Sequence, residues 1–284
     1  MGWNEINPSL TSAFLHLMHL PTINHINLSY IRNFPMSNLI PSVNLLRLDL
    51  YNLDPLEEEI VILSEMMPKF HEFHISHCPL MTTEVLDTKS QDGRPAFNFM
   101  DLRRLSTSLD DIQKVRYLLQ NAKVLEKLHL TVACGQSLVG LRDSLSSSAR
   151  TLKVLDLKVH IDSDISYVIL CEPFEGICEE LEALAGNNML EALSFEIVVP
   201  VCVDIDKTEE GIGSMIQNLE KVLVKPGWSS LRQVSFKIPV LICLVPDSVR
   251  LSKTLVQSLP DKYLSHLPKL ESVVFNFSSY MVED

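Results

Sequence analysis

The sequence predicts an α/β fold built from short repeats, a solenoid with a curved parallel sheet on its concave side and helices on its convex side. A triplet of apolar residues with the spacing L-x-x-L-x-L recurs nine times along the 284 residues, with Thr107 in place of the third apolar residue in the fourth copy. Segments with helical periodicity lie between the copies. The chain also lacks the phosphate-binding motifs G-x-G-x-x-G and G-x-x-x-x-G-K-[ST], which disfavours a doubly wound α/β sheet. A two-domain α+β protein remains an alternative, with residues 87–96 as its boundary.

Each triplet predicts a short strand, because alternate residues of a strand share one face. Chance alone matches three apolar positions in about one window in ten at this composition, so the prediction depends on the alternation with helices. Successive copies start 22, 25, 32, 23, 27, 38, 41 and 39 residues apart. The triplets are Ile23, Ile26, Leu28; Leu45, Leu48, Leu50; Phe70, Phe73, Ile75; Leu102, Leu105, Thr107; Leu125, Leu128, Leu130; Leu152, Leu155, Leu157; Leu190, Leu193, Phe195; Leu231, Val234, Phe236; and Leu270, Val273, Phe275.

Six segments between the triplets predict helices. The first covers residues 55–67. Its first turn holds three glutamates, Glu57 to Glu59, and the dipole of a helix favours negative charge there. The second covers residues 108–120, with Ser108 or Asp110 as its N-cap. The others are 138–145, 174–184, 212–224 and 249–259. A strand and a helix cannot bury their apolar faces within one repeat, so the repeats must stack. We therefore expect a single domain over residues 1–284 with a loop insertion near 87–96.

Charge and cysteine usage narrow the possible partners and the compartment. Asp and Glu number 36 against 24 Lys and Arg, a net charge of −12, which disfavours binding to nucleic acid or to an anionic membrane. The six cysteines include no C-x-x-C pair, which favours a reduced, intracellular protein of the cytoplasm or nucleus. The longest apolar stretches, such as 240–245, are far shorter than the ~20 residues that cross a bilayer.

No pattern in the sequence indicates catalysis. His71, His74, His77 and Cys78 form the densest group of potential metal ligands, but strand positions three apart face opposite sides, so these side chains do not converge. The chain has neither a G-x-S-x-G nor an H-E-x-x-H motif. We expect no catalytic residues, no cofactor and no metal, and hence not an enzyme. The alternative of another class is a catalytic α/β domain with its site at the strand ends.

One repeat carries a family resemblance. Phe70, Phe73, Ile75 and Cys78 fit the pattern L-x-x-L-x-L-x-x-[N/C], and the residues from Cys78 to Leu86 fit its continuation C-x-x-I-T-D-x-x-L in part. This pattern resembles the cysteine-containing leucine-rich repeat that is characteristic of F-box substrate receptors. Residues 8–22, 31–35 and 40–45 also resemble the irregular repeat region of fungal F-box-like proteins.

The resemblance implies the substrate-recognition part of a ubiquitin-ligase receptor, a non-catalytic scaffold for protein–protein interaction. Family members dock on a Skp-type adaptor through an F-box, and no F-box is visible before Ile23. We therefore expect a Skp-type adaptor to bind only if a longer chain contains one. Only Cys78 occupies the Asn/Cys position among the nine repeats, so the repeats are degenerate. A repeat fragment without a present partner is a further alternative.

The residues between the triplet positions should point to the concave side. The fixed charges there are five positive (Arg47, Arg104, Lys127, Lys158 and Lys237) and four negative (Asp49, Glu72, Asp156 and Glu196). This surface is thus predicted to be much less acidic than the rest and to suit a protein partner of mixed or mildly acidic charge. The bland alternative is that polar residues there serve solubility alone. The candidate partner-binding residues are Arg47, Asp49, Tyr51, Glu72, His74, Arg104, Lys127, His129, Asp156 and Lys158.

Overall fold

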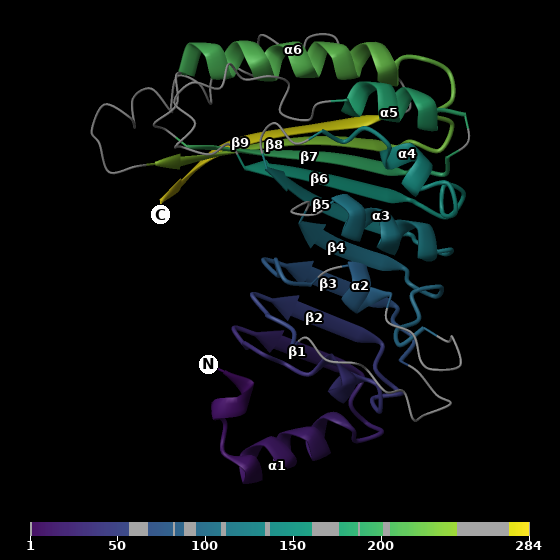
Figure 1. Cartoon of the computed structure of the whole chain (residues 1–284). Helices are drawn as coiled ribbons and strands as arrows, with labels where there is room; N and C mark the ends of the chain where they lie inside the picture. The colour runs from purple at the N-terminus through teal and green to yellow at the C-terminus, as the bar shows by residue number, and fades with distance from the viewer. Residues whose placement is uncertain are drawn as a thin grey trace. The chain divides into compact units, whose positions relative to one another are not determined.

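A computed structural model describes residues 2–56, 68–81, 83–87, 95–108, 112–133, 137–160, 176–186, 188–200, 205–242 and 273–283. The chain forms an α/β structure of two compact units, residues 1–126 and 127–284. Each unit is described by itself. Figure 1 shows the strands of each unit side by side, with helical segments between several of them along the chain.

The first unit contains a four-stranded parallel sheet. Its strands β1 (His25–Ser29), β2 (Arg47–Tyr51), β3 (Glu72–Ser76) and β4 (Arg104–Ser108) lie in sequence order, and each pairs in parallel with the next. The register aligns the triplets, since Leu48 pairs with Ile26 on one side and with Phe73 on the other. The other elements are η1 (Trp3–Glu5), α1 (Pro8–Met18), η2 (Met36–Leu39), α2 (Thr83–Leu86) and α3 (Ile112–Asn121).

The second unit repeats this plan with longer strands. Its strands are β5 (Lys127–Ala133), β6 (Val154–His160), β7 (Ala192–Pro200), β8 (Gln233–Ile242) and β9 (Val274–Glu283). They too are parallel and follow sequence order. The helices α4 (Leu141–Ser144), α5 (Ile177–Leu184) and α6 (Ile205–Leu223) succeed one another in the same order as the strands (Figure 1).

The apolar triplets form the core of each unit, as the repeat pattern predicts. All three triplet positions are buried in the seven repeats from Leu45 to Phe236, and Ile26 and Leu28 are buried in the first. Burying one such side chain contributes about 1.5–3 kcal/mol. Helices cover this apolar face with residues three or four apart, as with Val115, Leu118 and Leu119 of α3. The strand assignments are therefore confirmed for all the described triplets.

The helix boundaries differ from the predicted ones. Ser108 is not an N-cap but the last residue of β4, because the β-branched Thr107 continues the extended backbone. The predicted helix 138–145 shrinks to the four residues of α4, and turns rich in serine follow it. Helix α5 starts at Ile177 because Gly176 takes a left-handed φ of 78° before it.

The last described helix is longer than the periodicity predicts. Helix α6 starts at Ile205 rather than residue 212. Its glycines, Gly211 and Gly213, hid the earlier start, since glycine usually interrupts a helical pattern. The predicted helix 249–259, residues 57–67 of the first predicted helix and residues 88–94 of the predicted loop insertion lie outside the described residues.

Cys78 links two neighbouring repeats of the first unit from within the core. Its Sγ accepts a hydrogen bond from the backbone N–H of Leu53 at 3.4 Å and donates one to the carbonyl of Ser76 at 3.3 Å. Burial raises the pKa of the thiol, so it remains a neutral donor. Lys114 of α3 donates from Nζ to the carbonyl of Cys78 at 3.4 Å. Cys78 thus fastens one turn of the repeat to the preceding one.

Candidate functional site

One face of the strands in each unit is open to solvent. Side chains alternate between buried and exposed along β1, and the same alternation continues in β2, β3 and β6. All ten candidate residues lie at the exposed or half-buried positions of this alternation. Six of them, from Arg47 to Arg104, belong to the first unit and four, from Lys127 to Lys158, to the second. We call the exposed positions of β1–β4 the open face of the first unit.

A network of ion pairs crosses the open face near the strand starts. The guanidinium of Arg47 forks onto the carboxylate of Asp49, with Nε and Nη2 at 3.0–3.1 Å. His25 Nε2 lies 2.8 Å from Oδ2 of the same carboxylate, the oxygen that also accepts from Arg47 Nη2. Glu72 lies between two arginines, 3.5 Å from Arg47 and 3.0 Å from Arg104. Five side chains from four strands are therefore linked in one chain of contacts.

The pKa of Asp49 shows that this network is electrostatically coupled. Burial alone would raise the pKa of this carboxyl, but hydrogen bonds from Arg47 and His25 outweigh burial and hold the pKa below its ordinary value. The hydrogen bond to Asp49 in turn raises the pKa of Arg47. The forked arginine–carboxylate geometry orients both groups. Asp49 is thus the centre of the network and remains ionised at neutral pH.

The second unit carries separate pairs on its strands. Lys127 Nζ lies 3.3 Å from Asp156, and Lys158 Nζ lies 2.6 Å from Glu196. Four of the five cations predicted for this surface therefore face carboxylates of their own unit. The two opposite charges of each pair largely cancel each other's electrostatic field at a distance. The five positive and four negative groups do not add up to a positively charged patch that would attract an acidic partner.

Three aromatic side chains gather at the opposite ends of β1–β3. Tyr30, which directly follows β1, contacts Tyr51 edge to face with ring centroids 5.2 Å apart. Tyr51 contacts His77, which follows β3, in the same manner at 5.3 Å. Tyr30 is 59% exposed and Tyr51 38% exposed. We call Tyr30, Tyr51 and His77 the aromatic row.

The sequence pattern missed two members of the aromatic row for a structural reason. Strand alternation assigns Tyr30 to the same side as Ile26 and Leu28, and it assigns His77 to the side of Phe73. Both residues instead have a left-handed backbone, with φ of 59° and 53°, which turns their side chains out of the alternation. This conformation costs roughly 1–2 kcal/mol for a residue other than glycine. Asn52, at the equivalent position with φ of 47°, is of a residue type that often adopts this conformation.

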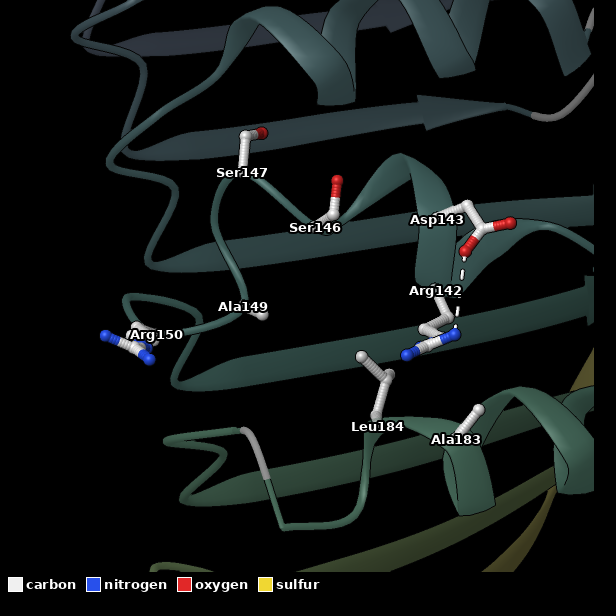
Figure 2. Close-up of a pocket in the computed structure, with 8 residues that line it drawn as sticks. All are labelled: Arg142, Asp143, Ser146, Ser147, Ala149, Arg150, Ala183 and Leu184. Atoms are coloured by element: carbon white, nitrogen blue, oxygen red, sulfur yellow. Dashed lines mark ion pairs between the residues drawn. The ribbon is translucent and has the colours of Figure 1, made fainter.

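A shallow pocket of about 380 Å³ lies in the second unit, beside α4 and the end of α5. Figure 2 shows that Arg142 faces Asp143 and that Arg150 points away from both. Arg142 and Asp143 form an ion pair at 3.8 Å, and the other lining residues are Ser146, Ser147, Ala149, Ala183 and Leu184. The lining thus holds two arginines, two serines and one carboxylate, and that carboxylate is paired with Arg142.

The histidines and the cysteine that form the densest group of potential metal ligands in the sequence do not converge in the part of the chain that the structure describes. Within those ranges, no three His, Cys, Asp or Glu side chains are grouped as metal ligands. His74 lies exposed on β3, and the buried Cys78 is engaged with backbone groups. No helix within the described ranges is both long and apolar enough to span a lipid bilayer.

Comparisons with known proteins identify no family for this chain. No protein-family model matches the chain, and no curated protein matches it.

Proposed function

We propose that this chain is an irregular leucine-rich-repeat solenoid whose exposed strand face binds another protein. The single observation that carries the proposal is the arrangement within each unit: parallel strands follow one another in sequence order, with one face buried under helices and the other open. A doubly wound sheet would bury both faces and would reverse its strand order. The bonds from Cys78 to Leu53 and Ser76 add support, because they satisfy backbone groups between repeats at the Asn/Cys position.

The open face has the composition of a protein-binding surface. It combines arginine and tyrosine, residue types that dominate binding energy at interfaces, with polar side chains such as Asn27 and His74. The ion pairs of Arg47, Asp49 and Glu72 keep its charged groups oriented before any partner arrives, which lowers the entropy cost of binding. The partner is thus selected by shape, hydrogen bonds and aromatic contact rather than by a positive field.

The finer proposal is that this scaffold reads substrates for an F-box-like ubiquitin ligase. It depends on the resemblance of residues 70–86 to the cysteine-containing repeat, in which Cys78 takes the signature position. In such a receptor, the repeats bind the substrate and the F-box binds the Skp-type adaptor. The exposed strand face would then be the substrate-reading surface.

Affinity purification with quantitative mass spectrometry tests the proposal with matched variants. Asn27→Arg plus His74→Arg enlarges two exposed side chains of the open face, one on each side of Asp49. Asn4→Arg plus His16→Arg makes the same chemical change at exposed positions outside the strands. We expect the first pair of substitutions to lower the recovery of a specific partner at least tenfold and the second pair to leave its recovery unchanged. Equal recovery with both pairs would contradict binding through the open face, and co-purification of a Skp-type adaptor decides the ligase proposal separately.

A further inference from the structure

The aromatic row has the geometry of a small binding site rather than of a core cluster. The planes of Tyr30 and Tyr51 meet at 68°, and those of Tyr51 and His77 at 74°. In both pairs, with ring centroids 5.2–5.3 Å apart, the edge of one ring lies against the face of the other. Tyr30, Tyr51 and His77 are all exposed, so those π surfaces meet solvent. The row lies at the carboxyl ends of three adjacent strands, near the arrowheads of β1–β3 (Figure 1).

Backbone and hydroxyl contacts hold these rings in place before any ligand binds. The backbones of Tyr30 and His77 are left-handed, and Tyr30 N–H donates to the carbonyl of Tyr51 on the neighbouring strand at 3.0 Å. Asn52 N–H donates in the same way to the carbonyl of Ser76 at 3.1 Å. A hydrogen bond between the side chains of Tyr51 and Tyr30 raises the pKa of Tyr30. A strained conformation that is fixed in this way is typical of a functional position.

The ligand class follows from the electrostatics around the rings. Aromatic faces carry negative potential and attract cations. The arginines of the open face lie at the other end of the strands. Arg47 and Arg104 are the first residues of β2 and β4, and Tyr51 is the last residue of β2. The Cα atoms of Arg47 and Tyr51 are thus about 13 Å apart at the usual rise per residue. Arg47 and Arg104 are also paired with Asp49 and Glu72. A chain of net charge −12 draws positively charged partners toward itself.

We propose that the aromatic row binds an arginine or lysine side chain of the protein partner. This inference rests on the proposed function, because it assigns part of the same exposed surface to one group of that partner. The cation lies against the faces of Tyr30 and Tyr51, with His77 as the third wall. The partner segment that reaches these strand ends is therefore basic, in contrast to the mildly acidic partner that the residue count of the strands predicts.

A peptide titration of the full chain tests the inference without knowledge of the partner. The probes are capped Gly-Ser-Xaa-Ser-Gly peptides with arginine, lysine, citrulline or glutamate at the central position, and the readout is the NMR shift of ring-labelled tyrosines. We expect the arginine and lysine peptides to shift Tyr30 and Tyr51, with affinities two- to fivefold higher per ring than that of neutral citrulline. Tyr280, 45% exposed on β9, is the matched ring and should not shift. Equal affinities for arginine and citrulline, or equal shifts at Tyr280, would overturn the proposal.

Variants separate this inference from the proposed function. Tyr30→Leu plus Tyr51→Leu removes both π faces and should lower the affinity for the arginine peptide at least fourfold. Tyr30→Phe plus Tyr51→Phe keeps both rings and should leave that affinity unchanged. The control Tyr280→Leu should have no effect. If Asn27→Arg plus His74→Arg removes the partner while the leucine pair retains both peptide and partner, the open face stands and the cation site is refuted. If neither pair affects the partner but the leucine pair loses the peptide, the proposed function fails, and of the inference only the affinity of the row for cationic side chains stands.

Discussion

The Sγ of Cys78 accepts the backbone N–H of Leu53 across 25 residues of sequence, at a distance of 3.4 Å. Both residues are buried, and the bond joins one repeat to the one before it. Among the residues that follow the nine triplets at this spacing, Cys78 is the only Asn or Cys.

The first prediction concerns this bond. Cys78→Ala should lower the free energy of unfolding by about 1–3 kcal/mol, because it leaves the buried N–H of Leu53 without its sulfur acceptor. Cys78→Ser keeps a polar side chain and should lose less. Urea unfolding followed by circular dichroism measures both. Equal losses for alanine and serine would show that the packing volume of the sulfur, not its hydrogen bonds, matters.

A second prediction concerns Glu180 in the second unit. Its two carboxylate oxygens accept the backbone N–H groups of Gly140 at 2.8 Å and Arg142 at 2.6 Å, so α5 caps the start of α4. Glu180→Gln replaces one acceptor by an NH₂ group that faces a donor, and we expect a loss of about 1–2 kcal/mol. Glu179→Gln, at an exposed position of the same helix, is the control and should stay within 0.5 kcal/mol, about the usual effect of surface substitutions. A loss as large for the control would mean that the cap contributes nothing.

The left-handed backbone of His77 gives a third prediction. His77→Ala and His77→Gly both remove the ring, but only glycine adopts a φ near 53° without steric cost. The glycine variant should therefore be about 1 kcal/mol more stable than the alanine variant, which reverses the usual order of the two residues in a folded chain. Thermal melts of the two variants provide the comparison. Alanine equal to or above glycine would contradict the strain at this position.

Asp49 predicts how stability depends on pH. The folded state holds the pKa of Asp49 below its ordinary value of about 3.9, so the unfolded state binds the proton more readily and stability rises with pH. The contribution is fully present above the ordinary pKa and disappears as pH falls through the lower, folded pKa. Asp49→Asn should thus be less stable than the wild type at pH 6, and the difference should shrink at pH 3 and below. A difference that stays constant from pH 6 to pH 2.5 would exclude this linkage.

The strands and the candidate residues on them could be predicted because burial alternates with period two, and the triplets carry that period. Tyr30 and His77 could not be predicted, since a left-handed residue breaks the alternation at the strand end and few residues other than glycine adopt that conformation. The charge balance of the strands could not predict which charged side chains form pairs. The sequence gives the number of cations on the strands, but the pairing of Arg47 with Asp49 depends on which residues lie side by side. Helix α6 began earlier than predicted because its glycines hid the start of the periodic pattern.

The central claim is that the exposed strand face contacts a protein partner, and site-specific photo-cross-linking in cells tests it most directly. A benzophenone amino acid at position 27 or 74 lies on the open face, and the same residue at position 4 or 16 lies outside the strands. We predict that one protein forms adducts from positions 27 and 74 and not from 4 and 16. Adducts only from positions 4 and 16, or no adducts from 27 and 74, would contradict the account.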